Sequence, residues 1–231
     1  MSEQRITQQK LILDKLLELV AFEGLSDATI IKAAVAANMH HMAGQRLFAG
    51  GVSELLAFYN TQLNDELQSL AAEHDLANMR THERIEWLLM QRFAQLEPHK
   101  EAIRRITAYS ALPWNIAGSG ERLWQTCDVM WRIAGDKSLD YNYYSKRTLL
   151  AKVYGLSLIF WLNDDGSNDA SINGDNMNDG SEQLQQFVQR QIAGVLNVGK
   201  KMGMANANIT KFVENTVDML INPSRYRTKK F

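Results

Sequence analysis

Apolar residues recur every three or four positions along most of this 231-residue chain, which is the spacing of amphipathic helices. The pattern predicts a first helix that stops at Gly24, a second over 28–39 that Ser26 or Asp27 caps, and a short third over 40–48. Longer helices are expected over the ranges 53–73, 82–96, 99–112, 119–134, 140–163, 181–203 and 207–221. The sequence therefore predicts an all-α protein.

One stretch interrupts the helical pattern. Residues 163–181 are rich in Asn, Asp, Gly and Ser, a composition that buries little apolar surface and predicts a flexible surface loop. Its acidic residues do not follow the calcium-loop pattern, because Met177 stands at the third position counted from Asp175 and no acid stands at the twelfth. We expect no calcium site here.

The composition supports a helical protein with a sizeable core, since 45 % of the residues are apolar. The formal net charge of −1 gives no general attraction to nucleic acid or to anionic lipid. The single Cys127 excludes an internal disulfide and suits a reducing compartment, and the first residues do not resemble a signal or transit peptide. A cytoplasmic protein is expected.

The three short helices and the long helix after them resemble the amino-terminal domain of TetR-type regulators. A helix-turn-helix that binds DNA strongly makes about six to ten phosphate contacts. Between positions 28 and 59 this chain offers only Lys32 and Arg46 as cations. Gly44 and Gln45 stand where TetR-type recognition helices usually carry a Leu-Tyr pair, and "AGG" replaces a common lysine. The pattern indicates a degenerate helix-turn-helix that does not favour nucleic-acid binding, with a ligand-responsive TetR-type repressor kept as the alternative.

The predicted helix over 140–163 contains an almost unbroken apolar run from Leu149 to Leu162. Such a helix must be buried on all sides or lie in lipid. A membrane span needs about 20 apolar residues, and this run is shorter and includes Lys152. We therefore expect a central helix that either packs as plain core or lines an apolar cavity.

Neighbouring helices carry matching stripes rich in Met and Trp, which could form ordinary core or close around an irregular, flexible ligand. Spacing alone does not choose between these two interpretations. The candidate ligand-contacting residues are Leu123, Trp124, Met130, Trp131, Val153, Tyr154, Leu156, Phe160, Phe187 and Ile192.

The segment "YNYYSKR" over 141–147 precedes the apolar run. Tyrosine and arginine are enriched at interaction hot spots, so the segment indicates a docking surface, although aromatics that seal the end of a helical bundle would look the same. The longer stretch over 130–162 is similar to the most recognisable segment of the ubiquinone-biosynthesis protein family Coq-nine. The matching positions are Met130, Trp131, Gly135, Asp136, Ser138, Asp140, Tyr141, Asn142, Tyr143, Tyr144, Ser145, Lys146 and Arg147.

This resemblance implies a TetR-like, all-α homodimer that does not regulate transcription. It implies an apolar cavity that binds an isoprenoid lipid or quinone precursor, and presentation of that precursor to a di-iron quinone hydroxylase. The docking role is carried over to Asn142, Tyr143, Tyr144 and Arg147. The family often has tryptophan where this chain has Tyr143, so the partner or its affinity could differ.

The resemblance also implies peripheral contact with the inner membrane through a terminal amphipathic helix. An apolar stripe followed by basic residues suits an interfacial helix, although it would also suit packing on the dimer with a solvated tail. The candidate membrane-contact residues are Phe212, Val213, Val217, Leu220, Lys229 and Lys230.

The sequence offers no arrangement typical of catalysis. Its five histidines lack metal-ligand spacing, and it has no phosphate loop, dinucleotide motif or paired carboxylates. We expect neither enzymatic activity nor a metal or other cofactor. The expected organisation is a degenerate helix-turn-helix-like domain over 1–60, a helical lipid-binding and dimerisation domain over 61–206, and the amphipathic helix and basic tail over 207–231.

Overall fold

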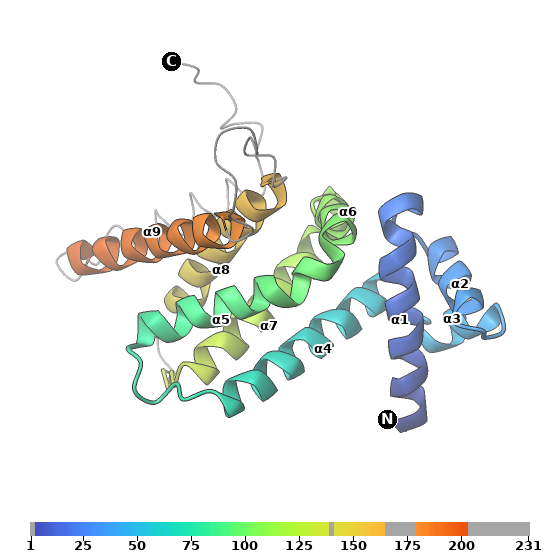
Figure 1. Cartoon of the computed structure of the whole chain (residues 1–231), viewed down its shortest axis with the longest axis horizontal. Coiled ribbons are helices and arrows are strands. Elements are labelled where there is room, and N and C mark those ends of the chain that lie inside the picture. The colour runs from blue at the N-terminus through green and yellow to red at the C-terminus, as the bar shows by residue number, and fades with distance from the viewer. Residues whose placement is uncertain (1–2, 139–140, 165–178, 203–231) are drawn as a thin grey trace, which may run out of the picture.

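A computed structural model describes residues 3–138, 141–164 and 179–202, and within these ranges every regular element is a helix (Figure 1). The predicted helix over 207–221 and the basic tail after it, which together hold all six candidate membrane-contact residues, lie outside the described residues, as does most of the predicted loop over 163–181. The helices are α1 (Glu3–Glu23), α2 (Asp27–Ala36), α3 (Met42–Leu47), α4 (Gly51–Glu73), α5 (Thr81–Leu96), α6 (Lys100–Ser110), α7 (Ile116–Ile133), α8 (Tyr141–Asn163) and α9 (Asp179–Met202), with short 3₁₀ turns at Glu97–His99 and Pro113–Asn115.

The first three helices form the three-helix unit that the sequence predicts. Gly24 ends α1 in the left-handed conformation at φ +77°, which glycine adopts without a steric penalty. Ser26 then caps α2, because its hydroxyl accepts a hydrogen bond from the Thr29 amide at 3.2 Å. The predicted stop near Asn38 is also observed, with Asn38 at φ +58°.

The junction between α3 and α4 explains two glycines that the sequence pattern left unexplained. Gly44 lies against α2, where an added Cβ would sit 3.0 Å from the Ile30 carbonyl oxygen. Gly51 opens α4 at φ +63°, and an added Cβ would meet the Asp27 carboxylate at 2.5 Å. That carboxylate accepts a hydrogen bond from the Val52 amide at 3.1 Å, which ties α2 to the start of α4. Both glycines therefore serve close packing.

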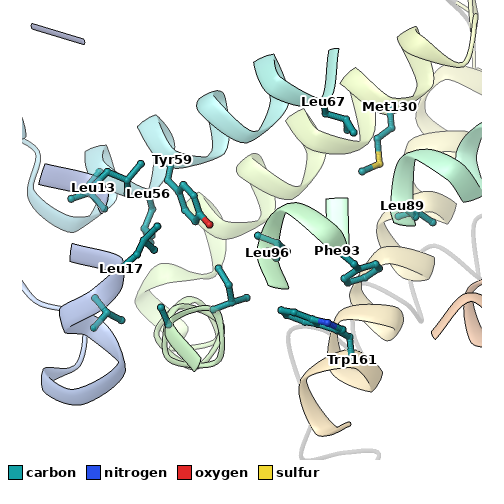
Figure 2. Close-up of a cluster of buried hydrophobic side chains, with 14 of the residues drawn as sticks. Leu13, Leu17, Leu56, Tyr59, Leu67, Leu89, Phe93, Leu96, Met130 and Trp161 are labelled. Carbon is teal, nitrogen blue, oxygen red and sulfur yellow. The ribbon is translucent and has the colours of Figure 1, made fainter. Parts of the chain in front are cut away.

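Helix α4 runs from this three-helix unit into the larger bundle of α5 to α9 (Figure 1). It packs against α5 and α7, while α8 packs between α7 and α9. Leu67, Leu89 and Met130 bring α4, α5 and α7 together, and the Phe93 ring of α5 lies 5.8 Å from the Trp161 ring of α8 (Figure 2). The predicted all-α architecture is confirmed for the described residues.

The expectation that α8 is buried on all sides is wrong. Leu150, Val153 and Trp161 face the core, but Ile159 is 55 % exposed and Leu156 is 36 % exposed. The helix therefore presents an apolar strip on its outer side as well as its inner side. No helix within the described ranges is long and apolar enough to cross a bilayer.

Candidate functional site

An apolar cleft lies among α5, α7, α8 and α9, and we call it the α8–α9 cleft. Its volume is about 450 Å³, which falls in the range typical of small-molecule sites. Its hydrocarbon walls include Ile85, Trp131, Leu149, Val153, Ile192 and Val195. Thr81, His82 and Lys146 supply the polar groups of its lining. Such a lining favours a largely apolar guest that carries few polar groups.

The structure separates the ten predicted ligand-contacting residues. Trp131, Val153 and Ile192 line the α8–α9 cleft, whereas Leu123 and Tyr154 line a different cleft between α4 and α7. Helical spacing identifies the apolar face of each helix, but it does not show which part of that face borders open space.

The other five predicted residues have other surroundings. Phe160 and Phe187 stack on each other at 4.3 Å, and Met130 is fully buried in the core. Trp124 lies beside Tyr143 and Tyr144, and Leu156 lies on the outer side of α8. These residues therefore do not share one cavity with Trp131.

Sequence reasoning missed the contribution of α5 to this cleft. His82 and Ile85 lie in the first two turns of α5, and both line the cleft. The amphipathic spacing of "HERIEW" could have marked Ile85 as inward-facing. Only the packing of α5 against α9 shows that this face borders a cleft.

A cluster of aromatic side chains lies beside the amino-terminal end of α8. We call it the α8 aromatic surface and define it as Trp124, Asn142, Tyr143 and Tyr144. The Tyr143 and Tyr144 rings meet edge to face at 5.1 Å, and the Trp124 ring lies 6.2 Å and 6.0 Å from them. Tyr144 is 61 % exposed, and Asn142 is also exposed. Packed aromatics with an exposed edge can serve as an interaction anchor.

Arg147 does not belong to this exposed surface, although the sequence placed it among the docking residues. Its side chain is buried beneath the surface, and its guanidinium lies 3.4 Å from the centre of the Tyr143 ring. Its Nε donates to Asp128 at 2.7 Å, and one terminal nitrogen donates to Asp136 at 3.1 Å. Arg147 therefore packs against the inner face of the Tyr143 ring and is not itself accessible to a partner.

The same network fixes the tyrosine and the charges around it. The Tyr143 hydroxyl donates to Asp128 at 3.0 Å, and the Lys146 ammonium donates to Asp136 at 2.6 Å. Burial alone would raise the pKa of Asp136, but hydrogen bonds from Lys146, Ser138 and Arg147 outweigh it and hold the pKa at about 2. Asp136 therefore remains ionised at neutral pH.

Lys146 links the cleft to the ion network beneath the aromatic surface, because it lines the cleft and pairs with Asp136, which in turn pairs with Arg147 under the Tyr143 ring. The Trp131 indole nitrogen donates to the Lys146 carbonyl oxygen at 3.0 Å, and the Lys146 ammonium lies 5.6 Å from the Trp131 ring. Both side chains line the α8–α9 cleft, while Lys146 also joins the ion network under Tyr143. The aromatic segment thus lies on the same helix as the cleft-lining residues Lys146, Leu149 and Val153.

The described residues contain no cluster of three or more His, Cys, Asp or Glu side chains that could hold a metal ion. Cys127 is fully buried, and this burial raises the pKa of its thiol to about 12. The thiol is therefore protonated and shielded from reagents at neutral pH. The described side chains of the site can therefore bind a ligand or partner by apolar burial and aromatic contact.

Comparison with known proteins agrees with the motif at 130–162. The sequence model of the COQ9 family matches residues 116–199, a range that contains α7, α8 and most of α9. The resemblance to the COQ9 (Coq-nine) family is confirmed. The segment that matches COQ9 includes the aromatic surface and most of the cleft.

Three curated COQ9 proteins illustrate the similarity. Human mitochondrial ubiquinone biosynthesis protein COQ9 is 29 % identical over 170 residues, which cover 71 % of this chain and 52 % of the human protein. COQ9-B of Xenopus laevis is 27 % identical over 208 residues, which cover 87 % of this chain and 66 % of the Xenopus protein. The probable ubiquinone biosynthesis protein coq9 of Dictyostelium discoideum is 25 % identical over 159 residues, which cover 66 % of this chain and 52 % of the Dictyostelium protein. The chain thus spans about half the length of the human and Dictyostelium proteins.

Among solved structures, a TetR transcriptional regulator from Nitrosomonas europaea superimposes with a TM-score of 0.60. The match covers 81 % of this chain and 97 % of the regulator at 17 % sequence identity. At this identity the comparison establishes the TetR-like fold alone.

Proposed function

We propose that this protein is a non-catalytic accessory protein of ubiquinone biosynthesis that binds an isoprenoid quinone precursor in the α8–α9 cleft. In this proposal it presents the precursor to a membrane-associated di-iron hydroxylase, which docks at the α8 aromatic surface. The observation that carries the proposal is the connection through Lys146, which lines the apolar cleft and also pairs with Asp136 in the ion network beneath the exposed aromatic cluster.

The pathway assignment rests on the relatives. The human and Xenopus proteins are named ubiquinone biosynthesis proteins, and the segment that matches their family contains the aromatic surface and most of the cleft. Intermediates that carry a polyprenyl tail are largely hydrocarbon, and the cleft offers a hydrocarbon lining. Each buried CH₂ group would contribute about 0.8 kcal/mol of binding free energy.

A homodimer and contact with the inner membrane complete the proposal. The outer side of α8 exposes Leu156 and Ile159, and a second copy of the chain would cover such an apolar strip. The terminal segment 207–231 lies beyond the described residues, and its apolar and basic pattern supports peripheral membrane contact from the cytoplasmic side.

Blocking the cleft tests lipid binding. Val153 is buried on the cleft wall, so Val153→Trp should fill part of the cleft and lower the isoprenoid lipid that copurifies with the protein at least tenfold. Val35→Trp is the matched control, because Val35 is 54 % exposed on α2, away from the cleft. Mass spectrometry of extracted lipid gives the measurement, and circular dichroism checks that both variants fold. Lipid-free wild-type protein from cells rich in quinone intermediates would contradict the proposal.

Removal of the exposed ring tests docking separately. Tyr144→Ala should leave the fold intact, since Tyr144 is 61 % exposed, and should weaken capture of the purified hydroxylase about tenfold, as expected for a hot-spot aromatic. Tyr143→Phe is the comparison, because it keeps the ring and removes only the hydroxyl that donates to Asp128. Unchanged capture by Tyr144→Ala would show that the partner docks elsewhere.

A further inference from the structure

A second cleft lies among α4, α6, α7 and α8, and we call it the α4–α7 cleft. Its volume is about 240 Å³, and its walls are mainly aliphatic, including Leu56, Leu63, Leu96, Ile103, Ile106 and Leu158. It shares no lining residue with the α8–α9 cleft. It is therefore a separate space that the proposed lipid site does not use.

Arg122 is the charged residue on the wall of this cleft, and no Asp or Glu lines it. One terminal nitrogen of Arg122 donates to the Ser119 hydroxyl at 3.1 Å. Within the described part of the chain, no carboxylate oxygen lies within 4.0 Å of the Arg122 nitrogens. The adjacent Glu121 instead accepts a hydrogen bond from Gln125 at 3.4 Å. The cleft thus carries a positive charge that no carboxylate of its own lining offsets.

Several other arginines of the described helices pair with a carboxylate, whereas Arg84 donates to three backbone carbonyl oxygens instead. Arg104 and Arg105 pair with Glu101 on α6, although all three side chains are exposed. Arg132 pairs with Asp128 one turn away on α7. Arg122 is half-buried against apolar side chains, where a charge is costly without a partner of opposite sign. This contrast points to an anion as the missing partner.

Arg92, a second arginine that is fully buried, lies behind the cleft and adds to the positive charge there. Arg92 is 1 % exposed and lies one helical turn before Leu96, which lines the cleft. It donates to the Asn64 side-chain oxygen, while its Nε has no hydrogen-bond partner in the described structure. Tyr59 and Tyr154 lie near Arg92 and line the cleft, and Tyr59 projects from α4 toward Leu96 (Figure 2). Neither tyrosine hydroxyl has a hydrogen-bond partner among the described residues, so both can donate to a ligand.

Gly155 gives the cleft its open wall on α8. An added Cβ at Gly155 would meet no heavy atom within 4 Å. Glycine in the middle of a helix is less stable than alanine. The helix therefore loses some stability by having glycine here, and in exchange this part of the cleft stays open. Gly155 lines the cleft, and a larger side chain there would occupy it.

We propose that the α4–α7 cleft binds a small monocarboxylic acid, with the carboxylate on the Arg122 guanidinium and the apolar body against Leu96, Ile106 and Leu158. Arginine and carboxylate form charge-assisted hydrogen bonds, often in pairs. The aliphatic walls would hold a short alkyl chain or one aromatic ring, and the small volume excludes a long polyprenyl tail. The cleft is therefore a binding site for a second ligand class.

Matched acids and alcohols test this site on the full-length protein. Octanoate and benzoate should raise the melting temperature and give saturable heats in titration calorimetry, whereas 1-octanol and benzyl alcohol should bind at least tenfold more weakly because they lack the charge. The stronger of the two acids identifies an alkyl or an aromatic body. Equal binding of acid and alcohol, or equal competition by inorganic phosphate, would overturn the proposal.

Three variants locate the binding. Arg122→Gln and Gly155→Leu should each lower octanoate affinity at least tenfold, the first by removing the charge and the second by filling the cleft. Arg105→Gln is the control for net charge, because Arg105 is exposed on α6, and it should bind octanoate normally. Val153→Trp should also bind octanoate normally, which separates this site from the proposed lipid cleft. Normal octanoate binding by folded Arg122→Gln would overturn the assignment.

Discussion

Arg147 sits among two carboxylates and an aromatic ring, with Asp128 at 2.7 Å, Asp136 at 3.1 Å and the Tyr143 ring at 3.4 Å. Its side chain is 2 % exposed, and that of Asp136 is 4 % exposed. A buried ion pair costs desolvation energy when it forms, but loss of one partner leaves the other charge buried without compensation. The network therefore makes the aromatic surface sensitive to single substitutions beneath it.

Substitution of Arg147 by methionine should lower the free energy of unfolding by about 3 kcal/mol, because two carboxylates then lose their shared cation. Urea denaturation followed by circular dichroism measures the change. Arg105→Met is the control, since Arg105 is 55 % exposed in its pair with Glu101, and it should change stability by less than about 0.5 kcal/mol. Equal stability of Arg147→Met and wild type would show that the network does not stabilise the fold.

Asp136 should make stability depend on pH in the acid range. Its folded pKa of about 2 lies below its ordinary value of 3.8, so the ionised form stabilises the fold above about pH 4, and this contribution disappears as the pH falls toward 2. Its size is about 2 kcal/mol. Asp136→Asn should be less stable than wild type at pH 7, and the difference should shrink by pH 2. Parallel pH profiles in urea denaturation would contradict this assignment.

At the scale of elements, α3 shows how a helix that is weak by composition is held in place. It has six residues, and Arg5 and Gln9 of α1 both donate to the Leu47 carbonyl oxygen at its end, at 3.3 Å and 2.9 Å. Gly44 lets α3 approach the backbone of α2. Tertiary contacts thus compensate for poor helix propensity.

Gly44→Ala should destabilise the protein by about 1 kcal/mol, because crowding at the Ile30 carbonyl outweighs the gain in helix propensity. Gly155→Ala is the matched control on α8, where an added Cβ meets open space, and it should stabilise the protein by up to about 1 kcal/mol. Thermal denaturation of both variants provides the comparison. If Gly44→Ala raised the melting temperature as much as Gly155→Ala, the close contact between α2 and α3 would not limit stability.

The helices themselves were largely predictable, because periodic apolar positions and capping residues such as Ser26 act locally. Clefts depend on contacts between distant elements, so spacing could not separate Trp131 in a cleft wall from Met130 in solid core. The motif likewise suggested that Arg147 was accessible, whereas Asp128 and Asp136 draw it inward. The exposure of Leu156 and Ile159 was missed for the same reason, since an apolar run does not show which of its sides lacks a neighbour.

At the scale of the whole molecule, the three-helix unit keeps the shape of a DNA-binding domain but lacks its surface chemistry. Lys32 on α2 pairs with Glu23 at 2.6 Å, which reduces its availability to phosphate. Val35 and Met42 of α2 and α3 are 54 % and 52 % exposed, so apolar groups stand among the exposed residues of these helices. The TetR-like fold is therefore a weak argument for the repressor alternative.

Purified protein should give no saturable shift of duplex DNA at about 50 mM salt, because too few cations are available for the phosphate contacts that strong binding requires. Electrophoretic mobility and fluorescence anisotropy measure the interaction. Lys32→Ala with Arg46→Ala provides the internal check, since it removes the two cations available between positions 28 and 59. Tight binding to wild type that falls steeply with salt and vanishes in the double variant would support a repressor.

The position of Trp131 supplies an intrinsic optical signal. Its indole borders the α8–α9 cleft, whereas Trp114 is 76 % exposed on the turn before α7. A hydrocarbon guest would shield Trp131 from the solvent and shift its emission to shorter wavelength, while acrylamide would still quench Trp114. Guest exchange could then be timed by stopped-flow fluorescence without an attached dye.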